Sequence, residues 1–209
     1  GTFLPISFNT DSSNSPVPIY LSAPFVGLLG LSPEVGRLPY ILLGIGSIFV
    51  LYLLAKELLE KESIALAAAF VLAVSPWHLH VTRTAYDSVF AMFFFLIGIY
   101  LFVKAAKKGK SILWSLIPFL LAFYSYHATK FVFIFLLPVL VILFYSKLKQ
   151  QKKTVILFSV GYVAILITFF LSLSISGVNR QDETLLSFKD ERATSTVNYE
   201  RSYNEAPLF

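Results

Sequence analysis

The sequence predicts an all-α, polytopic membrane protein, with a bundle of transmembrane helices, one short interfacial helix and a polar extracytoplasmic tail. Hydrophobic residues make up 56% of its 209 residues and charged residues only 14%, whereas roughly a quarter of an ordinary soluble domain is charged. The apolar residues form long runs, several of which approach the roughly 20 residues that span a bilayer. Cysteine is absent, so disulfides and thiolate metal sites are excluded.

Residues 1–33 are expected to form an external loop that contains the interfacial helix. The first part of this loop is polar and rich in serine and asparagine. Pro16 and Pro18 are expected to end it in an extended or turn conformation. Residues 19–30 are apolar but too few to span a membrane, so we expect them to lie as a helix along its surface.

Residues 34–175 are predicted to form six transmembrane helices. Ser32-Pro33-Glu34 is typical of a helix start, with serine at the N-cap, proline at the first helical position and an acid in the first turn. Gly44 and Gly46 lack the strand-turn-helix context of a nucleotide-binding loop and are assigned to helix packing. The expected spans are 34–55, 63–76, 88–103, 111–126, 131–145 and 154–174.

The tail, residues 176–209, is polar, mixed in charge and free of hydrophobic periodicity. We expect it to start an extracytoplasmic segment, which is either a disordered end or the opening of a further domain. The chain begins with Gly1 in place of methionine and ends inside this polar segment. These features predict a fragment of a longer protein.

Lysine and arginine predict the orientation in the cell membrane. Alternate connections carry most of the lysines, namely Lys56, Lys61, Lys104, Lys107, Lys108, Lys110, Lys147, Lys149, Lys152 and Lys153. The opposite connections carry only Arg37, Arg83 and Lys130. The positive-inside rule therefore makes the lysine-rich connections cytoplasmic and the opposite face extracytoplasmic. The net charge of +5 does not indicate nucleic acid, because no nucleic-acid motif accompanies these short lysine-rich connections.

The stretch 75–87 concentrates polar side chains between two apolar runs, where ionisable groups are costly unless they function. Arg83 and Asp87 are four residues apart and are expected to share one helical face. They form either a structural ion pair or a site in which Arg83 binds a phosphate while Asp87 orients a hydroxyl or a metal. His78 and His80 would point to different sides of a helix, which disfavours a metal site built from them alone.

Both histidines are instead expected at the membrane interface beside Trp77, although an imidazole can also donate to a sugar hydroxyl or a pyrophosphate. A second polar cluster occupies residues 124–130, where His127 and Lys130 would be neighbours on one helical face. Snorkelling of a lysine to the headgroups explains Lys130. It does not explain the adjoining Tyr-Ser-Tyr-His sequence, for which binding of a lipid phosphate is the alternative.

Five segments together resemble a known family in their order and spacing. They are residues 3–6 (Phe-Leu-Pro-Ile), 16–21, 36–39 (Gly-Arg-Leu-Pro), 75–83 and 124–130. The likeness covers nearly the whole chain and is to membrane glycosyltransferases with the GT-C fold. The branch it resembles includes relatives of the protein O-mannosyltransferases and of the aminoarabinose transferases of lipid A.

The resemblance implies transfer of a sugar from a polyprenyl-phosphate donor on the outer membrane face. It implies a carboxylate general base that deprotonates the acceptor hydroxyl. In the family this acid belongs to an Asp-Glu pair upstream of the Phe-Leu-Pro stretch, after the first span. We therefore expect this fragment to lack the first span and that pair, which would leave it inactive by itself.

The resemblance and the chemistry together assign the site. The predicted catalytic residues are Asp87 and, as a weaker candidate, Asp11. The predicted donor-phosphate ligands are Arg83, His127, Lys130 and Arg37, the last of which could equally be an interface anchor. The predicted substrate contacts are His78, Tyr86 and Tyr126. No cofactor is assigned, although a divalent metal ion beside Asp87 would suit the chemistry.

The expected partners are the polyprenyl-phosphate sugar donor, membrane lipids and a glycan, lipid or protein acceptor. A membrane transporter is the main competing function, but it would need ionisable groups near the bilayer midplane. In this sequence the charged residues lie at the ends of the apolar runs. A polymerase or ligase of lipid-linked glycans and a non-catalytic membrane subunit are two further candidate functions.

Overall fold

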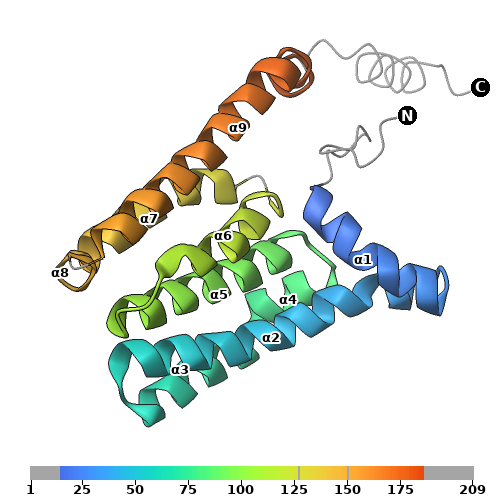
Figure 1. Cartoon of the computed structure of the whole chain (residues 1–209). Coiled ribbons are helices and arrows are strands. Elements are labelled where there is room, and N and C mark those ends of the chain that lie inside the picture. Colours follow the sequence, from blue (N-terminus) through green and yellow to red (C-terminus); the bar gives the residue numbers. More distant parts are fainter. Residues whose placement is uncertain (1–14, 127, 150, 186–209) are drawn as a thin grey trace, which may run out of the picture. The chain divides into compact units, whose positions relative to one another are not determined.

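The structure of the chain, a computed structural model, describes residues 15–126, 128–149 and 151–185, with side chains as far as residue 168. Every regular element in these ranges is a helix (Figure 1), which confirms the all-α prediction. The chain forms two compact units, residues 1–162 and 163–209. The helices are α1 Pro16–Leu29, α2 Pro33–Leu59, α3 Glu62–Val74, α4 Pro76–Arg83, α5 Ser88–Lys107, the 3-10 helix η1 Ile112–Ser115, α6 Leu116–Phe123, α7 Thr129–Leu143, α8 Tyr145–Leu148 and α9 Lys152–Leu185.

Each of the six predicted spans contains a helix. Within the described ranges, α2 and α5 are each long and apolar enough to cross a membrane, and α3 with α4 would form a third, bent span. Three further apolar stretches are shorter: α1, the pair η1–α6, and α7. The chain is therefore a helical membrane bundle. That it crosses the membrane six times stays a prediction.

Prolines begin the first two helices. α1 begins at Pro16 and has Pro18 in its first turn, so the expected extended or turn conformation is wrong. The first turn of a helix needs no backbone N–H donor, and proline fits there without strain. α2 begins as predicted, because the Ser32 hydroxyl oxygen accepts a hydrogen bond from the Val35 amide at 3.3 Å.

The predicted second span is bent in the structure. α3 and α4 meet at an angle of 54°. Pro76 cannot donate a backbone hydrogen bond, and the Ser75 amide donates to the Leu72 carbonyl at 3.2 Å. Most of the polar stretch expected at one membrane face is therefore helical, as α4.

The first unit is built around α2 and α5. α2 packs against α1, α3, α4 and α5, and α5 also packs against η1 and α6; Figure 1 shows α2 running alongside α3 and α5. The predicted packing role of the glycines is confirmed. A Cβ atom on Gly44 would lie 2.6 Å from Thr82 of α4, and one on Gly46 would lie 2.7 Å from Phe93 of α5.

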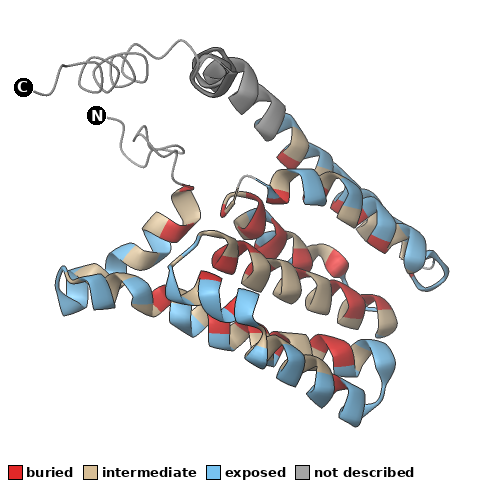
Figure 2. Cartoon of the chain, turned by 180° about the vertical axis from the view of Figure 1, so that it is seen from behind, coloured by how far each residue is buried: buried red, intermediate tan, exposed pale blue. Residues whose placement is uncertain are grey.

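Phenylalanine fills the core of this unit. Among the residues that the structure describes, the fully buried phenylalanines are Phe90, Phe102, Phe119, Phe123, Phe133 and Phe158. Their rings meet at tilted or edge-on angles, with centroids 5.0 Å apart for Phe123 and Phe133 and 5.5 Å for Phe102 and Phe158, the arrangement that aromatic quadrupoles favour. Figure 2 shows the buried positions concentrated on α5 and α6.

The described part of the second unit is the remainder of α9, residues 163–185. α9 has 34 residues in all. It continues beyond residue 174, where the sixth span was expected to end, so the first ten residues of the expected tail are helical. The rest of the tail lies outside the described residues.

Candidate active site

Asp87 is held by a tyrosine from another helix. It lies at the N-cap of α5, and the Tyr40 hydroxyl of α2 donates a hydrogen bond to its Oδ1 at 3.3 Å. The Tyr40 ring meets Phe90 edge-on, with centroids 4.8 Å apart. Sequence reasoning missed Tyr40. The one signal for it is its position three residues after Arg37, which puts both side chains on one face of α2.

The connection between α4 and α5 turns sharply. Arg83 is the last residue of α4 and is exposed, and Ala85 adopts the left-handed conformation with φ 56°. The Tyr86 amide closes the turn by donating to the Val81 carbonyl at 3.1 Å. The expectation that Arg83 and Asp87 share one helical face is therefore wrong, because α4 ends at Arg83 and Asp87 lies beyond it. Tyr86 keeps 56% of its surface exposed.

The two histidines of α4 point in different directions, as predicted. His80 is exposed. His78 is only 2% exposed and lies beside the backbone of Gly44 on α2. His78 is therefore buried in the bundle, because α4 lays one of its faces against α2, and its position at the membrane interface stays a prediction. His78 contributes to the anchoring of the helix that ends at Arg83.

The second predicted cluster forms the connection between α6 and α7. The Thr129 hydroxyl donates to the Ala122 carbonyl at 3.0 Å and the Ser125 hydroxyl to the Leu121 carbonyl at 2.6 Å. These bonds fold the connection back on the end of α6. The Lys130 ammonium lies 6.0 Å from the centre of the Phe123 ring, which is the outer limit of a cation–π contact.

Tyr126 is half-buried in this connection. His127 and Asp11 lie outside the described residues, so their predicted roles stay predictions. Arg37 is exposed near the start of α2.

One hydrophobic cluster joins the elements at this end of the first unit. Phe90 and Phe94 of α5 pack with Ala122 of α6, and Tyr40 and Val17 pack against them. The ends of α4 and α6 and the starts of α2 and α5 thus lie at the same end. This end, which we call the Asp87 end, carries Arg37, Tyr40, Arg83, Tyr86, Asp87, Tyr126 and Lys130. Of these residues, Tyr40 and Asp87 are joined directly by a hydrogen bond.

In the described ranges, no three histidine or carboxylate side chains gather around a point where they could hold a metal ion. Asp87 is the one predicted ligand in that part of the chain. A divalent ion beside it stays a prediction.

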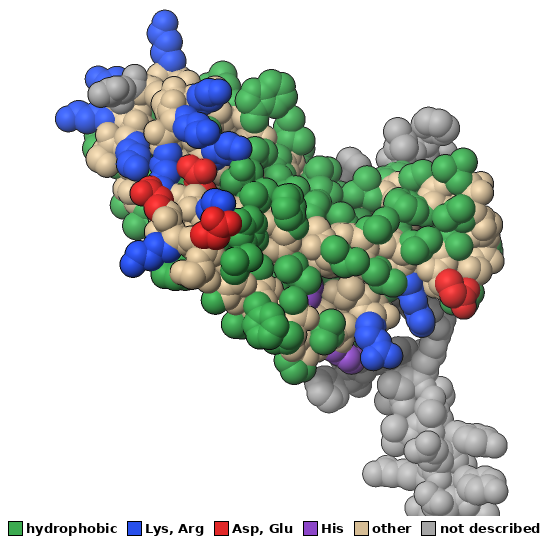
Figure 3. All heavy atoms as spheres, turned by 90° about the horizontal axis from the view of Figure 1, so that it is seen from below, with side chains coloured by type: hydrophobic (Ala, Val, Ile, Leu, Met, Phe, Trp, Pro, Cys, Tyr) green, Lys and Arg blue, Asp and Glu red, His purple; other side chains and the backbone are tan. Residues whose placement is uncertain are grey.

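The opposite end carries the lysines. Tyr40 and Lys56 are separated by 16 residues of α2, or about 24 Å. The Lys107 ammonium lies 2.7 Å from the Glu60 carboxylate and also donates to the Glu57 carbonyl, and Lys56 lies 3.3 Å from Glu62. Figure 3 shows most of the basic side chains gathered at one end and separated by apolar surface from the histidines, beside which further basic side chains lie.

The Glu60 carboxyl, in the connection between α2 and α3, has a pKa below its ordinary value. The main cause is the hydrogen bond from Lys107, and the charges of Lys107 and Lys147 add to it. Lysines from three different connections thus meet at this end, which we call the lysine end. The predicted alternation of the connections is confirmed, and the side of the membrane that each end faces stays a prediction.

Apolar helices with their charged side chains gathered at two opposite ends are typical of a helical membrane protein. The profile of the dolichyl-phosphate-mannose-protein mannosyltransferases matches residues 13–174. The chain belongs to this family of membrane glycosyltransferases. The match includes every described residue of the Asp87 end.

Two proteins of Bacillus subtilis (strain 168) are similar to the chain. The protein named "Putative mannosyltransferase YkcB" is 30% identical over 135 residues, which is 65% of this chain and 19% of that protein. The one named "Putative mannosyltransferase YycA" is 27% identical over 186 residues, which is 88% of this chain and 26% of that protein. The chain thus spans about a fifth to a quarter of the length of these relatives. No solved structure matches the chain.

Proposed function

We propose that this chain is the part of a mannosyltransferase-like enzyme that binds a polyprenyl-phosphate sugar donor, and that the Asp87 end is its active face, outside the cell membrane. The sugar passes to a hydroxyl of a protein, lipid or glycan. Family membership supports the reaction class. We choose this end because it holds the Asp87 carboxylate, to which the Tyr40 hydroxyl donates a hydrogen bond at 3.3 Å. The exposed Arg83 lies just before it in the chain.

In this proposal Arg83 binds the donor phosphate. A guanidinium donates two parallel hydrogen bonds to a phosphate. Its charge matters most in the transition state, because negative charge grows on the phosphate oxygen as the anomeric C–O bond breaks. Lys130, Arg37 and His127 are the further candidates for phosphate contacts, and the polyprenyl phosphate is the leaving group.

Asp87 orients the acceptor in this proposal. Its carboxylate accepts a hydrogen bond from the acceptor hydroxyl, or holds a divalent ion that does so, while the hydroxyl oxygen bonds to the anomeric carbon. The hydroxyl proton goes to a general base. Asp11 and an upstream Asp-Glu pair are the candidates for that base. Tyr86 and Tyr126 are the candidate contacts to the sugar and the acceptor, whereas the buried His78, also a predicted contact, anchors α4.

Arg83→Ala in the full-length protein tests the proposal. Transfer of mannose from polyprenyl-phosphate mannose should fall at least tenfold, because a charged hydrogen bond to the phosphate contributes roughly 1.5–3 kcal/mol, while membrane insertion stays normal. Lys153→Ala, an equal loss of charge at the lysine end, should transfer like the wild type. Normal transfer by Arg83→Ala would contradict the proposal.

A further inference from the structure

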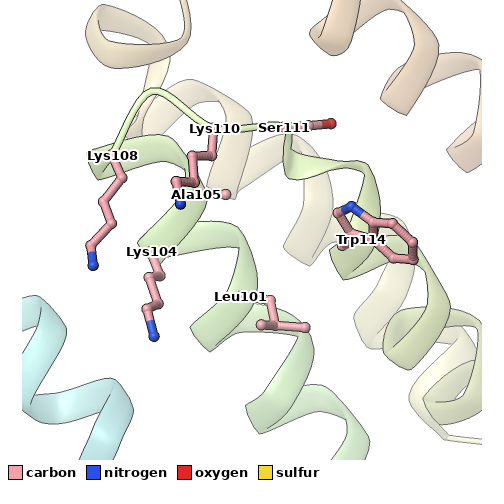
Figure 4. Close-up of a pocket in the computed structure, with 7 residues that line it drawn as sticks. All are labelled: Leu101, Lys104, Ala105, Lys108, Lys110, Ser111 and Trp114. Carbon is pink, nitrogen blue, oxygen red and sulfur yellow. The ribbon is translucent and has the colours of Figure 1, made fainter.

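The lysine end holds a pocket that the proposed reaction does not use. The pocket has a volume of about 430 Å³ and lies between the last turn of α5, the connection to η1 and η1 itself. Leu101 and Ala105 of α5 form its apolar part. Lys104, Lys108 and Lys110 lie on one side of it and Trp114 on the other (Figure 4).

The positive charge of the lysines in this pocket is neutralised less than that of neighbouring lysines, because fewer carboxylates pair with them. Lys56 and Lys107 each lie within 4 Å of a glutamate. Within the described part of the chain, Lys108 and Lys110 form no ion pair with a carboxylate. The Lys104 ammonium donates to a neutral partner, the Tyr100 hydroxyl at 2.7 Å, and the charge of Glu57 acts on it more weakly. The pocket therefore carries a surplus of positive charge that suits an anion.

The rest of the lining suits a lipid more than a soluble anion. Trp114 is 72% exposed on η1, and exposed tryptophans at the ends of apolar helices lie at the level of the lipid headgroups. Leu101 lies one turn below Lys104 on α5, so apolar surface continues from the pocket along a helix that is long enough to cross the membrane. A ligand with a phosphate and an attached acyl chain would match both parts.

We propose that this pocket binds the phosphate headgroup of an anionic glycerophospholipid from the surrounding leaflet. Lys104, Lys108 and Lys110 contact the phosphate, with ammonium groups that each have three donors. The Trp114 indole lies against the glycerol region, and the acyl chains follow Leu101 along α5. The proposal holds whichever leaflet surrounds the lysine end, and it is independent of the transfer reaction proposed at the Asp87 end.

The test uses Trp114 as a local reporter in the full chain. The chain has two tryptophans, so Trp77→Phe leaves Trp114 as the single fluorophore. The protein is placed in phosphatidylcholine nanodiscs that contain a minor fraction of phosphatidylglycerol, and either lipid carries bromine atoms that quench tryptophan on contact. Brominated phosphatidylglycerol should be preferred over brominated phosphatidylcholine by more than about fivefold, because one lysine near an anionic lipid contributes about that factor and three line the pocket.

Lys108→Gln/Lys110→Gln should reduce this preference to about fivefold or less, because Lys104 is then the single lysine left in the lining. The matched control is Lys152→Gln/Lys153→Gln, because these exposed lysines belong to the same end but do not line the pocket, and it should keep the preference. The reciprocal reporter, Trp114→Phe with Trp77 retained at the start of α4, should be quenched equally by both lipids, which shows that the preference is local to the pocket.

Three outcomes would overturn the proposal. Equal quenching of Trp114 by the two brominated lipids would mean that the pocket does not select an anionic lipid. An equal loss of preference in the Lys152→Gln/Lys153→Gln control would assign the effect to the general charge of the lysine end. Inorganic phosphate that relieves quenching more than chloride at the same ionic strength would assign the pocket to a free anion.

Discussion

At the scale of single residues, the bond between Tyr40 and Asp87 sets the position of a carboxylate across 47 residues of sequence. Asp87 could be singled out from sequence, because a carboxylate at the edge of an apolar run is costly without a role. Tyr40 could not, because its partner is remote and no local pattern reports that contact. The same holds for His78, whose burial depends on how α4 packs against α2.

Tyr40→Phe removes this hydrogen bond and keeps the ring that packs on Phe90. We expect a three- to tenfold fall in kcat for sugar transfer with little change in KM for the donor, because roughly 1 kcal/mol of carboxylate positioning is lost. Asp87→Asn should have the larger effect. The measurement is the steady-state kinetics of transfer by the full-length enzyme.

The double variant gives the control for this prediction. If Tyr40 acts through Asp87, adding Tyr40→Phe to Asp87→Asn should cause no further loss, because residues that act as a unit are non-additive. Effects that multiply in the double variant would show that the two side chains act separately.

At the scale of elements, the helix starts were easier to predict than the breaks. Ser32-Pro33-Glu34 predicts the start of α2, since its capping contacts lie within one turn. Pro16 and Pro76 were harder to interpret, because a proline can either end a segment or begin a helix. Which of the two occurs depends on tertiary packing, so α4 and the early start of α1 were missed.

Gly44→Ala tests the close approach of α4 to α2. The new Cβ would lie 2.6 Å from Thr82 Cγ2, so α4 or Thr82 has to shift, and overpacking of this kind costs roughly 1–3 kcal/mol. We expect a lower Tm in detergent, and also weaker sugar transfer, since Arg83 ends the displaced helix.

Gly36→Ala is the matched control on the same helix. A Cβ at Gly36 meets nothing within 4 Å, so the gain in helix propensity of about 0.5–1 kcal/mol should appear alone and raise the Tm. A rise in Tm of the same size for Gly44→Ala would rule out the tight contact.

The bond between Glu60 and Lys107 ties the connection after α2 to the end of α5. The pKa of Glu60 is lowered by this bond, so its contribution to stability is full above the ordinary carboxyl pKa and is lost as the pH falls through the lowered value. The Tm of the wild type should exceed that of Glu60→Gln at neutral pH, and the difference should shrink once the pH falls below 4.5.

Thermal unfolding across a pH series checks this prediction, with Lys107→Gln as the background control. In that background Glu60→Gln should leave the pH dependence almost unchanged, because the cause of the lowered pKa has been removed. A difference that grows toward acid pH would have the wrong sign for a lowered pKa.

At the scale of the whole molecule, the segregation of charge could be predicted almost completely. The order of the chain shows the alternation of lysine-rich and lysine-poor connections directly. In the structure Lys56 lies beside Glu62 and Lys107 beside Glu60, whose pKa the charge of Lys147 also lowers. The lengths of the spans were less predictable, since η1 and α6 divide the fourth apolar run into shorter pieces.

Single cysteines test which side of the membrane each end faces. The chain has no cysteine, so Thr84→Cys at the Asp87 end and Lys61→Cys at the lysine end each introduce one exposed label site. We expect a membrane-impermeant maleimide to label Thr84→Cys in intact cells and Lys61→Cys only after permeabilisation. The reverse pattern would invert the proposed orientation.

The bend between α3 and α4 determines how far Arg83 extends beyond the end of α3. α4 has eight residues and is about 12 Å long, but at 54° to α3 it advances only about 7 Å along the axis of α3. A straight continuation would place Arg83, at the end of α4, about 5 Å farther along that axis. In the proposed function, the bend therefore brings the guanidinium closer to the level of the apolar helices, where a phosphate attached to an isoprenoid chain would be bound.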